Sequence, residues 1–191
     1  MNPILLIVLA IIVIAIVLAV AMYNGLVQRR LRVDEAWSQI DVQLKRRYDL
    51  IPNLVNAVKG YMGFEQRVLE NVTQARANAV AAGAQGPRAQ AAAEGQLTQA
   101  LRSLFAVAEN YPDLKANQNV VQLQEQLATT ENQISYTREA YNTSVRTYNT
   151  SIATFPAVLM AGMMGFTARE FFEAEPAAAE VPSVDLSLPS T

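Results

Sequence analysis

The residue types that most often carry enzyme chemistry are sparse in this sequence. It contains no cysteine and no histidine, which excludes disulfides, Cys/His zinc sites, histidine general bases and thiol nucleophiles. It also contains no nucleophile elbow, P-loop, HExxH motif or glycine-rich phosphate loop. Chemistry based on lysine or carboxylates stays open, but no acidic cluster has the spacing of metal ligands. We therefore expect a protein that is not an enzyme and holds no cofactor and no metal.

Arginines provide the clearest candidate binding groups. Arg29, Arg30 and Arg32 follow a long apolar run, and we expect them to contact anionic lipid headgroups. The net charge of −2 gives no basic field that would suggest binding to nucleic acid.

A second basic run, Lys45-Arg46-Arg47, has three interpretations. It is a solvated helix face, or a headgroup site, or a source of ion pairs across a helical bundle. Headgroup binding is disfavoured, because a straight helix would place Lys45 about 35 Å beyond the apolar run. In the third interpretation, Arg46 or Arg47 pairs with one of three acids: Asp41, Glu65 or Glu131.

The apolar run itself predicts one transmembrane helix over residues 4–22. Its 19 residues include no charged or hydrogen-bonding side chain, and a helix of this length rises about 28 Å, close to the thickness of a bilayer core. A cleaved signal peptide is an alternative, because Ala19-Val20-Ala21 has the A-x-A form, and a buried core helix is another. The uncharged N-terminal flank and the long apolar core argue against cleavage. The arginines after the run place the following residues in the cytoplasm by the positive-inside rule.

The rest of the chain predicts an all-α protein: an N-terminal transmembrane helix that continues into an antiparallel bundle of long helices. Residues 1–3 form a short non-cytoplasmic N-terminus, 23–173 the bundle, and 174–191, rich in Ala, Pro, Glu and Ser, a disordered tail. A first stripe of apolar residues lies over 27–51. No Gly or Pro separates this stripe from Arg32, so we expect the transmembrane helix to continue into it unbroken. Pro52 is expected to break or kink it. Further helices are expected over 53–82, 88–109 and 117–154.

The last of these helices carries two rows of residues at intervals of seven, a heptad seam. The first row is apolar and the second is mixed, which suits packing inside a bundle. Asn142 and Asn149 each follow a tyrosine of the first row. We interpret both as part of a solvated face, with fixing of the helix register as the alternative. Residues 157–172, rich in Met and Phe, predict a final core helix or a partner contact, with an interfacial amphipathic segment as the alternative.

Several motifs resemble the LemA family. The similarity begins at Tyr23-Asn24-Gly25 and is densest from Val33 through Val55, in the stretch VDEAWSQIDVQLKRRYDLIPNLV. It continues through Tyr111-Pro112-Asp113, Tyr141-Asn142 and Tyr148-Asn149 to Phe155-Pro156 and Gly165-Phe166, and so covers about residues 20–173. From this resemblance we take ten residues as candidates for a structural or partner-binding motif. They are Trp37, Asp41, Arg46, Arg47, Asp49, Pro52, Asn53, Phe155, Pro156 and Phe166.

The resemblance implies a single-pass protein of the bacterial inner membrane with a helical bundle. It also implies an envelope protein partner, such as a membrane metalloprotease, since such genes often lie nearby. The magnetosome protein MamQ is similar to this family, which implies a role in organising membranes. The leading hypothesis is therefore a non-catalytic scaffold or adaptor anchored in the lipid bilayer. The alternative is a homo-oligomer that shapes membranes.

Overall fold

The structure is a computed structural model that describes residues 2–61 and 65–173. The described residues contain helices and no strand, which confirms the all-α class. The long helices are α1 (Pro3–Lys59), α2 (Gln66–Ala82), α3 (Pro87–Ala108) and α5 (Gln118–Ala153). A one-turn helix, α4 (Pro112–Lys115), precedes α5, and a 3-10 turn, η1 (Ala157–Leu159), follows it. The helices predicted over 88–109 and 117–154 agree with α3 and α5 to within one residue at each end.

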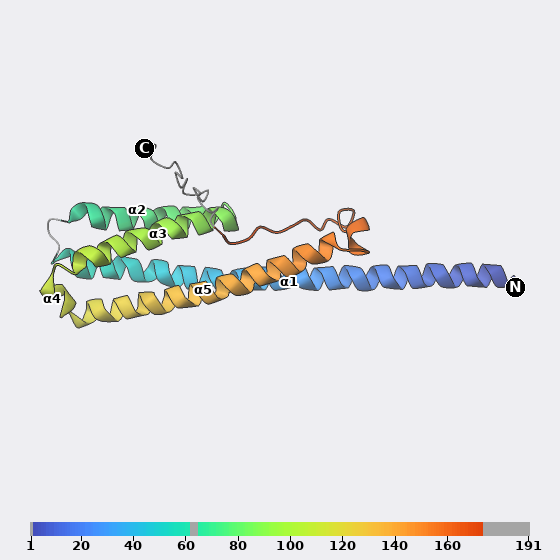
Figure 1. Cartoon of the computed structure of the whole chain (residues 1–191), viewed down its shortest axis with the longest axis horizontal. Coiled ribbons are helices and arrows are strands. Elements are labelled where there is room, and N and C mark those ends of the chain that lie inside the picture. The colour runs from blue at the N-terminus through green and yellow to red at the C-terminus, as the bar shows by residue number, and fades with distance from the viewer. Residues whose placement is uncertain (1, 62–64, 174–191) are drawn as a thin grey trace, which may run out of the picture.

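The helices form an antiparallel bundle along one half of α1 (Figure 1). α5 returns beside α1, and the α2–α3 hairpin covers the part of α1 that is furthest from the N-terminus (Figure 1). Beyond the bundle, the N-terminal part of α1 extends alone. An 18-residue window of α1 has a mean hydropathy of 3.7 and none of it is buried. The helix is therefore long and apolar enough to cross a membrane, which supports membrane anchoring.

Of the two outcomes expected for Pro52, a break does not occur: α1 continues through it to Lys59. Proline has no N–H to donate to the carbonyl four residues earlier, which here belongs to Tyr48. Arg76 of α2 replaces the lost donor, because its Nε donates to the Tyr48 carbonyl at 2.7 Å. The helix expected over 53–82 is therefore divided. Its first part is the end of α1, and α2 starts only at Gln66.

This compensation predicts an energetic coupling between Pro52 and Arg76. Arg76→Ala should lower the free energy of unfolding by about 1–3 kcal/mol, because it leaves the Tyr48 carbonyl without a donor. In a Pro52→Ala background the loss should shrink by at least about 1 kcal/mol, since the introduced alanine supplies the missing N–H. Denaturant unfolding in detergent, followed by circular dichroism, measures both losses, with Arg67→Ala on the exposed side of α2 as control. Equal losses in the two backgrounds would reject the coupling.

Two apolar clusters form the core. The distal cluster joins α1, α2, α3 and α5, and its most buried members include Leu54, Val72, Leu97 and Leu104. The proximal cluster lies nearer the anchor and joins α1 and α5 to the C-terminal segment. Its buried members are Leu26, Val33, Ile40, Leu44, Ala91, Ile134, Tyr141, Val145, Tyr148, Ala157, Ala161, Phe166 and Phe172.

The C-terminal segment is not the helix expected over 157–172. After η1 the chain turns at Gly165, whose φ of 76° suits glycine, and residues 166–173 run back along the bundle as an extended segment, here called the strap (Figure 1). The strap buries Phe166 and Phe172. It covers the part of the α1–α5 pair that the α2–α3 hairpin does not reach (Figure 1). The predicted disordered tail, 174–191, lies outside the described residues.

Candidate functional site

A buried ion-pair cluster joins three helices between the two apolar clusters. Arg47 of α1 is only 3% exposed. Its Nη1 lies 3.1 Å from Oε2 of Glu94 on α3 and 2.9 Å from Oε2 of Glu131 on α5. Its Nη2 donates to the Thr98 hydroxyl at 2.8 Å. Arg47 thus makes one of the pairings considered from the sequence, with Glu131, while its partner Glu94 was missed.

Tyr48 and Gln90 extend this cluster. The Tyr48 hydroxyl donates to Oε1 of Glu94. Gln90 Nε2 lies 2.6 Å from that hydroxyl, 3.1 Å from Glu94 Oε1 and 3.1 Å from the Ala79 carbonyl. Burial raises the pKa of the Tyr48 phenol, so it stays a donor. The cluster therefore ties α1, the end of α2, α3 and α5 together at one level of the bundle.

Burial also raises the pKa of Glu94, although Tyr48, Arg47 and Gln90 oppose the shift. A carboxyl with a raised pKa in the folded state stabilises the fold fully below its unfolded pKa, here about 4.5. That contribution is lost as the pH rises through the folded pKa. We therefore expect the wild type to lose stability relative to Glu94→Gln as the pH rises from about 4.5. The measured quantity is the free energy of unfolding of the wild type minus that of the variant, and it should fall. Denaturant titrations across this range test it, and a difference that is constant or grows with pH would contradict it.

The Arg47 cluster leaves little room for a bound ligand. The crevice beside Arg47 has a volume of 180 Å³, below the range of about 300–1,000 Å³ that is usual for ligand pockets. Its charges are already paired with one another. Among residues 2–61 and 65–173, no group of three or more acidic side chains is placed to hold a metal.

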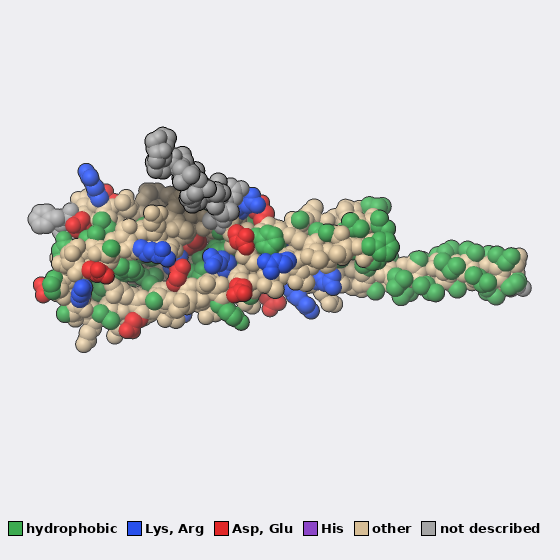
Figure 2. Space-filling model, in the orientation of Figure 1, with side chains coloured by type: hydrophobic (Ala, Val, Ile, Leu, Met, Phe, Trp, Pro, Cys, Tyr) green, Lys and Arg blue, Asp and Glu red, His purple; other side chains and the backbone are tan. Residues whose placement is uncertain are grey.

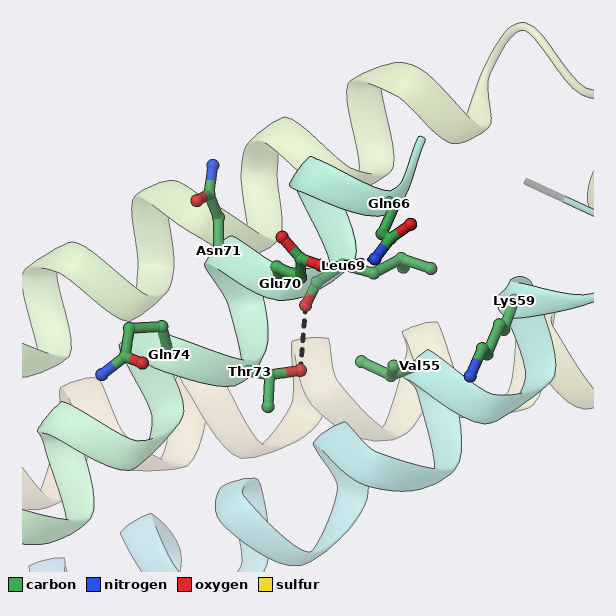
Figure 3. A pocket seen from close by; sticks show the side chains of 8 residues that line it. All are labelled: Val55, Lys59, Gln66, Leu69, Glu70, Asn71, Thr73 and Gln74. Carbon is green, nitrogen blue, oxygen red and sulfur yellow. Dashed lines mark hydrogen bonds between the residues drawn. The ribbon is translucent and has the colours of Figure 1, made fainter. Parts of the chain in front are cut away.

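A larger groove of about 770 Å³ lies between α1 and α2 (Figure 3). Its lining includes the polar residues Lys59, Gln66 and Glu70 and the apolar residues Val55 and Leu69. Thr73 at its wall donates to the Leu69 carbonyl of its own helix (Figure 3). The groove is open, and we assign no chemistry to it.

The second candidate feature is a set of tyrosine and asparagine side chains on α5 that binds the backbone of the strap. Asn149 accepts from the Arg169 N–H at 2.8 Å and donates to the Arg169 carbonyl at 2.9 Å. Asn142 accepts from the Phe172 N–H at 2.9 Å and donates to its carbonyl at 3.4 Å. The interpretation of both asparagines as a solvated face is therefore wrong. Each asparagine side chain supplies the donor and the acceptor that a neighbouring β-strand would supply to an extended backbone.

The tyrosines of the same heptad row complete this arrangement. Tyr148 donates to the Thr167 carbonyl at 3.0 Å, and Tyr141 donates to the Glu170 carbonyl at 2.8 Å. Burial raises the pKa of Tyr141 to about 12, so its hydroxyl stays protonated and donates. We call these four residues, Tyr141, Asn142, Tyr148 and Asn149, the Tyr–Asn clamp.

The spacing of the clamp matches the spacing of an extended chain. Seven residues of α-helix rise about 10.5 Å, and three residues of extended chain rise about 10 Å. One heptad on α5 therefore corresponds to three strap residues, which is the step from Thr167 to Glu170 and from Arg169 to Phe172. Because the contacts are to backbone atoms, the clamp selects an extended conformation rather than particular side chains.

Side chains of the strap lock it onto α1 as well. Trp37 packs against Tyr141, with ring centroids 5.3 Å apart, and against Phe172 at 5.7 Å. Arg169 pairs with Asp34 at 2.8 Å on the surface. Trp37 is therefore a packing residue of the proximal cluster.

The other predicted site residues are divided between the surface and the core. Asp41, Arg46, Asp49 and Asn53 are exposed on α1, and Asn53 donates to the Asp49 carbonyl at 3.4 Å. Arg46 has no ion pair with Asp41 or Glu65 within the described residues, so the pairing considered for it is not formed.

Near the anchor, the predicted residues lie close together. Phe166 is 4% exposed and its ring meets that of Tyr23 with centroids 5.5 Å apart. Arg30 also contacts this ring, with Cζ 5.5 Å from the Phe166 centroid. Phe155 and Pro156, joined by a cis peptide bond, are exposed. Arg29 and Arg32 are also exposed.

Comparison with known proteins agrees with these motifs. No curated protein matches the chain. The family model described as the LemA family matches residues 36–186, which contain the Arg47 cluster, the Tyr–Asn clamp and the strap. The match begins later and ends later than the range expected from the motifs. Because it covers most of the sequence, this chain belongs to the LemA family.

Proposed function

We propose that this protein is a non-catalytic scaffold or adaptor of the bacterial cell envelope. Its bundle, on the cytoplasmic side of the inner membrane, presents a surface to an envelope protein partner such as a membrane metalloprotease. The lipid bilayer holds the anchor and, through it, sets the height of that surface above the membrane.

The observation that carries this proposal is the continuity of α1. Its exposed apolar part passes into the bundle core without a break, and buried positions recur at Leu26, Val33 and Ile40. The bundle is therefore mounted on the anchor as one rod, with no flexible linker. A rigid mount is useful when a surface must be held at a fixed distance from a membrane partner.

Two further observations support a binding role over catalysis. The charged groups of the Arg47 cluster satisfy one another in the bundle interior. Large apolar side chains are exposed on the outside of the bundle, among them Tyr136 on α5 at 70% and Val42 on α1 at 62%. The pairs Trp37–Tyr141 and Arg47–Glu131 set an antiparallel register that puts Val42 and Tyr136 at the same level.

Site-specific photo-crosslinking in native membranes tests the adaptor role. A photoreactive residue at Val42 or Tyr136 should give a discrete adduct with one partner protein. Recovery of the monomer alone from both positions would contradict the proposal.

A pair of insertions tests whether the rigid mount matters. Gly-Ser-Gly-Ser between Met22 and Tyr23 breaks the rod, whereas Ala-Leu-Ala-Leu at the same place adds the same number of residues as helix. We expect the flexible insertion to abolish the adduct. The helical insertion turns the bundle only about 40° beyond a full turn and should retain more of the adduct. Equal yields from both insertions would show that the rigid connection is irrelevant.

Topology is a separate part of the proposal. Arg29, Arg30 and Arg32 directly follow the anchor, which favours a cytoplasmic bundle. A reporter enzyme active only in the periplasm, fused after Glu173, should remain inactive. Activity of that fusion would reverse the assignment.

The alternative, a membrane-shaping oligomer related to magnetosome proteins, is favoured by one observation. Large apolar side chains are exposed around Phe155 and Met163, next to the anchor. Purified full-length protein should then form oligomers and deform liposomes under electron microscopy. Unchanged vesicles together with a monomeric protein would reject this alternative.

A further inference from the structure

In the turn between α5 and the strap, small side chains are buried and large apolar side chains are exposed, the reverse of the usual arrangement. Its small residues Ala157 and Ala161 are buried, at 6% and 4% exposure. Four of its large apolar residues are exposed: Phe155 is 80% exposed, Val158 50%, Leu159 67% and Met163 89%. We call these four the apolar turn. A cluster of exposed apolar side chains marks a surface that contacts a membrane or another protein.

The apolar turn lies at the level where the transmembrane run of α1 ends. Phe166, three residues after Met163, contacts the ring of Tyr23, and Met22 and Val27 pack in the same cluster as Ala157 and Ala161. Figure 1 shows the turn at the end of the bundle from which α1 emerges, and Figure 2 shows apolar side chains gathered there. If residues 4–22 cross the bilayer, the turn meets its surface.

Arginines predominate among the charged residues at this end. Residues 2–33 and 140–169, which build it, contain no Asp or Glu. They contain five arginines: Arg29, Arg30, Arg32, Arg146 and Arg169. Of these, Arg169 is paired with Asp34, and the structure records no ion pair of the other four with described residues. An array of this kind is complementary to anionic lipid.

A groove beside the apolar turn brings part of this charge together with hydroxyl groups. Arg29 of α1 and Arg146 of α5 line it with Thr147, Thr150, Ser151 and Thr154. Thr154 directly precedes Phe155 of the apolar turn, so the groove opens next to these exposed side chains. Arg29 is seven residues, or about 10 Å, past Met22, and a long arginine side chain covers that distance to the headgroup layer.

We propose that this end of the bundle is a second membrane contact. The apolar turn inserts into the lipid interface beside the anchor, and the groove between Arg29 and Arg146 binds the phosphate of an anionic lipid headgroup. Two contacts of this kind fix the tilt and rotation of the bundle, which a single helix leaves free. The basic residues come from α1 and α5, which explains why the sequence of the turn lacks the basic face of a membrane-surface helix. This inference does not depend on the adaptor role or on an oligomer.

The chain has no cysteine, so single-cysteine variants report insertion directly. A polarity-sensitive fluorophore is attached to Met163→Cys in the full-length protein, reconstituted in vesicles of phosphatidylcholine and phosphatidylglycerol at 3:1. We expect blue-shifted emission that nitroxide-labelled lipids quench, as for a probe at Val20→Cys in the anchor. A probe at Gln122→Cys, exposed near the start of α5, should stay aqueous. If the Met163 probe behaves like the Gln122 probe, insertion is refuted.

Spin-labelled lipids test the headgroup site separately. Wild-type protein should slow the motion of spin-labelled phosphatidylglycerol more than that of spin-labelled phosphatidylcholine. The ratio of the two effects is the headgroup preference. One arginine near an anionic surface changes binding up to about fivefold. Arg146→Gln should therefore lower this preference by up to that factor, and Arg29→Gln/Arg146→Gln should lower it further. Arg138→Gln, exposed two turns earlier on α5, should leave it unchanged. If the double variant keeps the wild-type preference, the groove does not bind headgroups.

Discussion

Replacing Arg47 with alanine should lower the free energy of unfolding by about 3–5 kcal/mol, the largest loss expected for any exchange of a single charged residue in this bundle. Arg47 is buried between the carboxylates of Glu94 and Glu131. Its removal leaves two like charges facing each other, with Glu94 buried and without its main cation. Denaturant unfolding of the detergent-solubilised protein, followed by circular dichroism, measures the loss.

The neighbouring residue is a matched control. Arg46 is exposed and has no ion pair within the described residues, so Arg46→Ala should change the free energy of unfolding by no more than about 0.5 kcal/mol. Adding Glu94→Gln to Arg47→Ala should recover part of the loss, because it removes the buried negative charge while keeping the shape of the side chain. Equal effects of Arg46→Ala and Arg47→Ala would contradict the assignment of Arg47 to the core.

The double variant Asn142→Ala/Asn149→Ala should release the strap. It removes four hydrogen bonds to the strap backbone, at Arg169 and Phe172, each worth about 0.5–1.5 kcal/mol. Hydrogen exchange of the Arg169 and Phe172 amides should accelerate at least about tenfold, since every 1.4 kcal/mol is a factor of ten. Fluorescence of Trp37, the only tryptophan in the chain, should also change, because it packs against Phe172.

Two variants separate loss of the clamp from a general effect on α5. Tyr141→Phe/Tyr148→Phe keeps both rings in the core and removes only the hydrogen bonds to Glu170 and Thr167, so it should accelerate exchange less. Asn132→Ala changes an exposed asparagine of the same helix and should leave exchange at the strap unaltered. Unchanged exchange in the double asparagine variant would show that packing alone holds the strap.

Much of the fold follows from local patterns. The apolar run, the helix breakers around residues 83–87 and 110–112, and the heptad rows of α5 predict the helices well because each is decided by nearby residues. Pro52 shows where such reasoning fails. Its cost is a missing hydrogen bond, and the replacement donor, Arg76, comes from another helix. That donor is not visible in the local sequence.

The buried polar residues carried a sequence signal that a search for apolar stripes passes over. Arg47 falls in the same seven-residue series as Leu26, Val33, Ile40 and Leu54, all buried. Gln90 and Glu94 likewise extend the series of Leu97, Leu101 and Leu104 on α3. Polar residues at core positions of two helices are expected to meet, because burial without partners is costly.

The strap was harder to predict, since nothing in residues 166–173 has the alternation of a strand. Its conformation is imposed by the side chains of α5, which supply the hydrogen bonds that a neighbouring strand would give. The repeated Tyr-Asn pair, seven residues apart, was the available signal. This signal can be interpreted only once the rise of one heptad of α5 is matched to the rise of three extended strap residues. That match involves both elements and cannot be read from either one alone.

The central claim, that α1 is one rigid rod from the membrane into the bundle, is tested most directly by a distance measurement. Val20 and Val42 are exposed, at 55% and 62%, and cysteines at both positions can carry spin labels. In a continuous helix, 22 residues separate them by about 33 Å and place them within about 40° around the axis. Pulsed electron paramagnetic resonance in vesicles should give one narrow distribution near that distance. A broad distribution, or one centred well below it, would show a hinge between anchor and bundle and contradict the rigid mount.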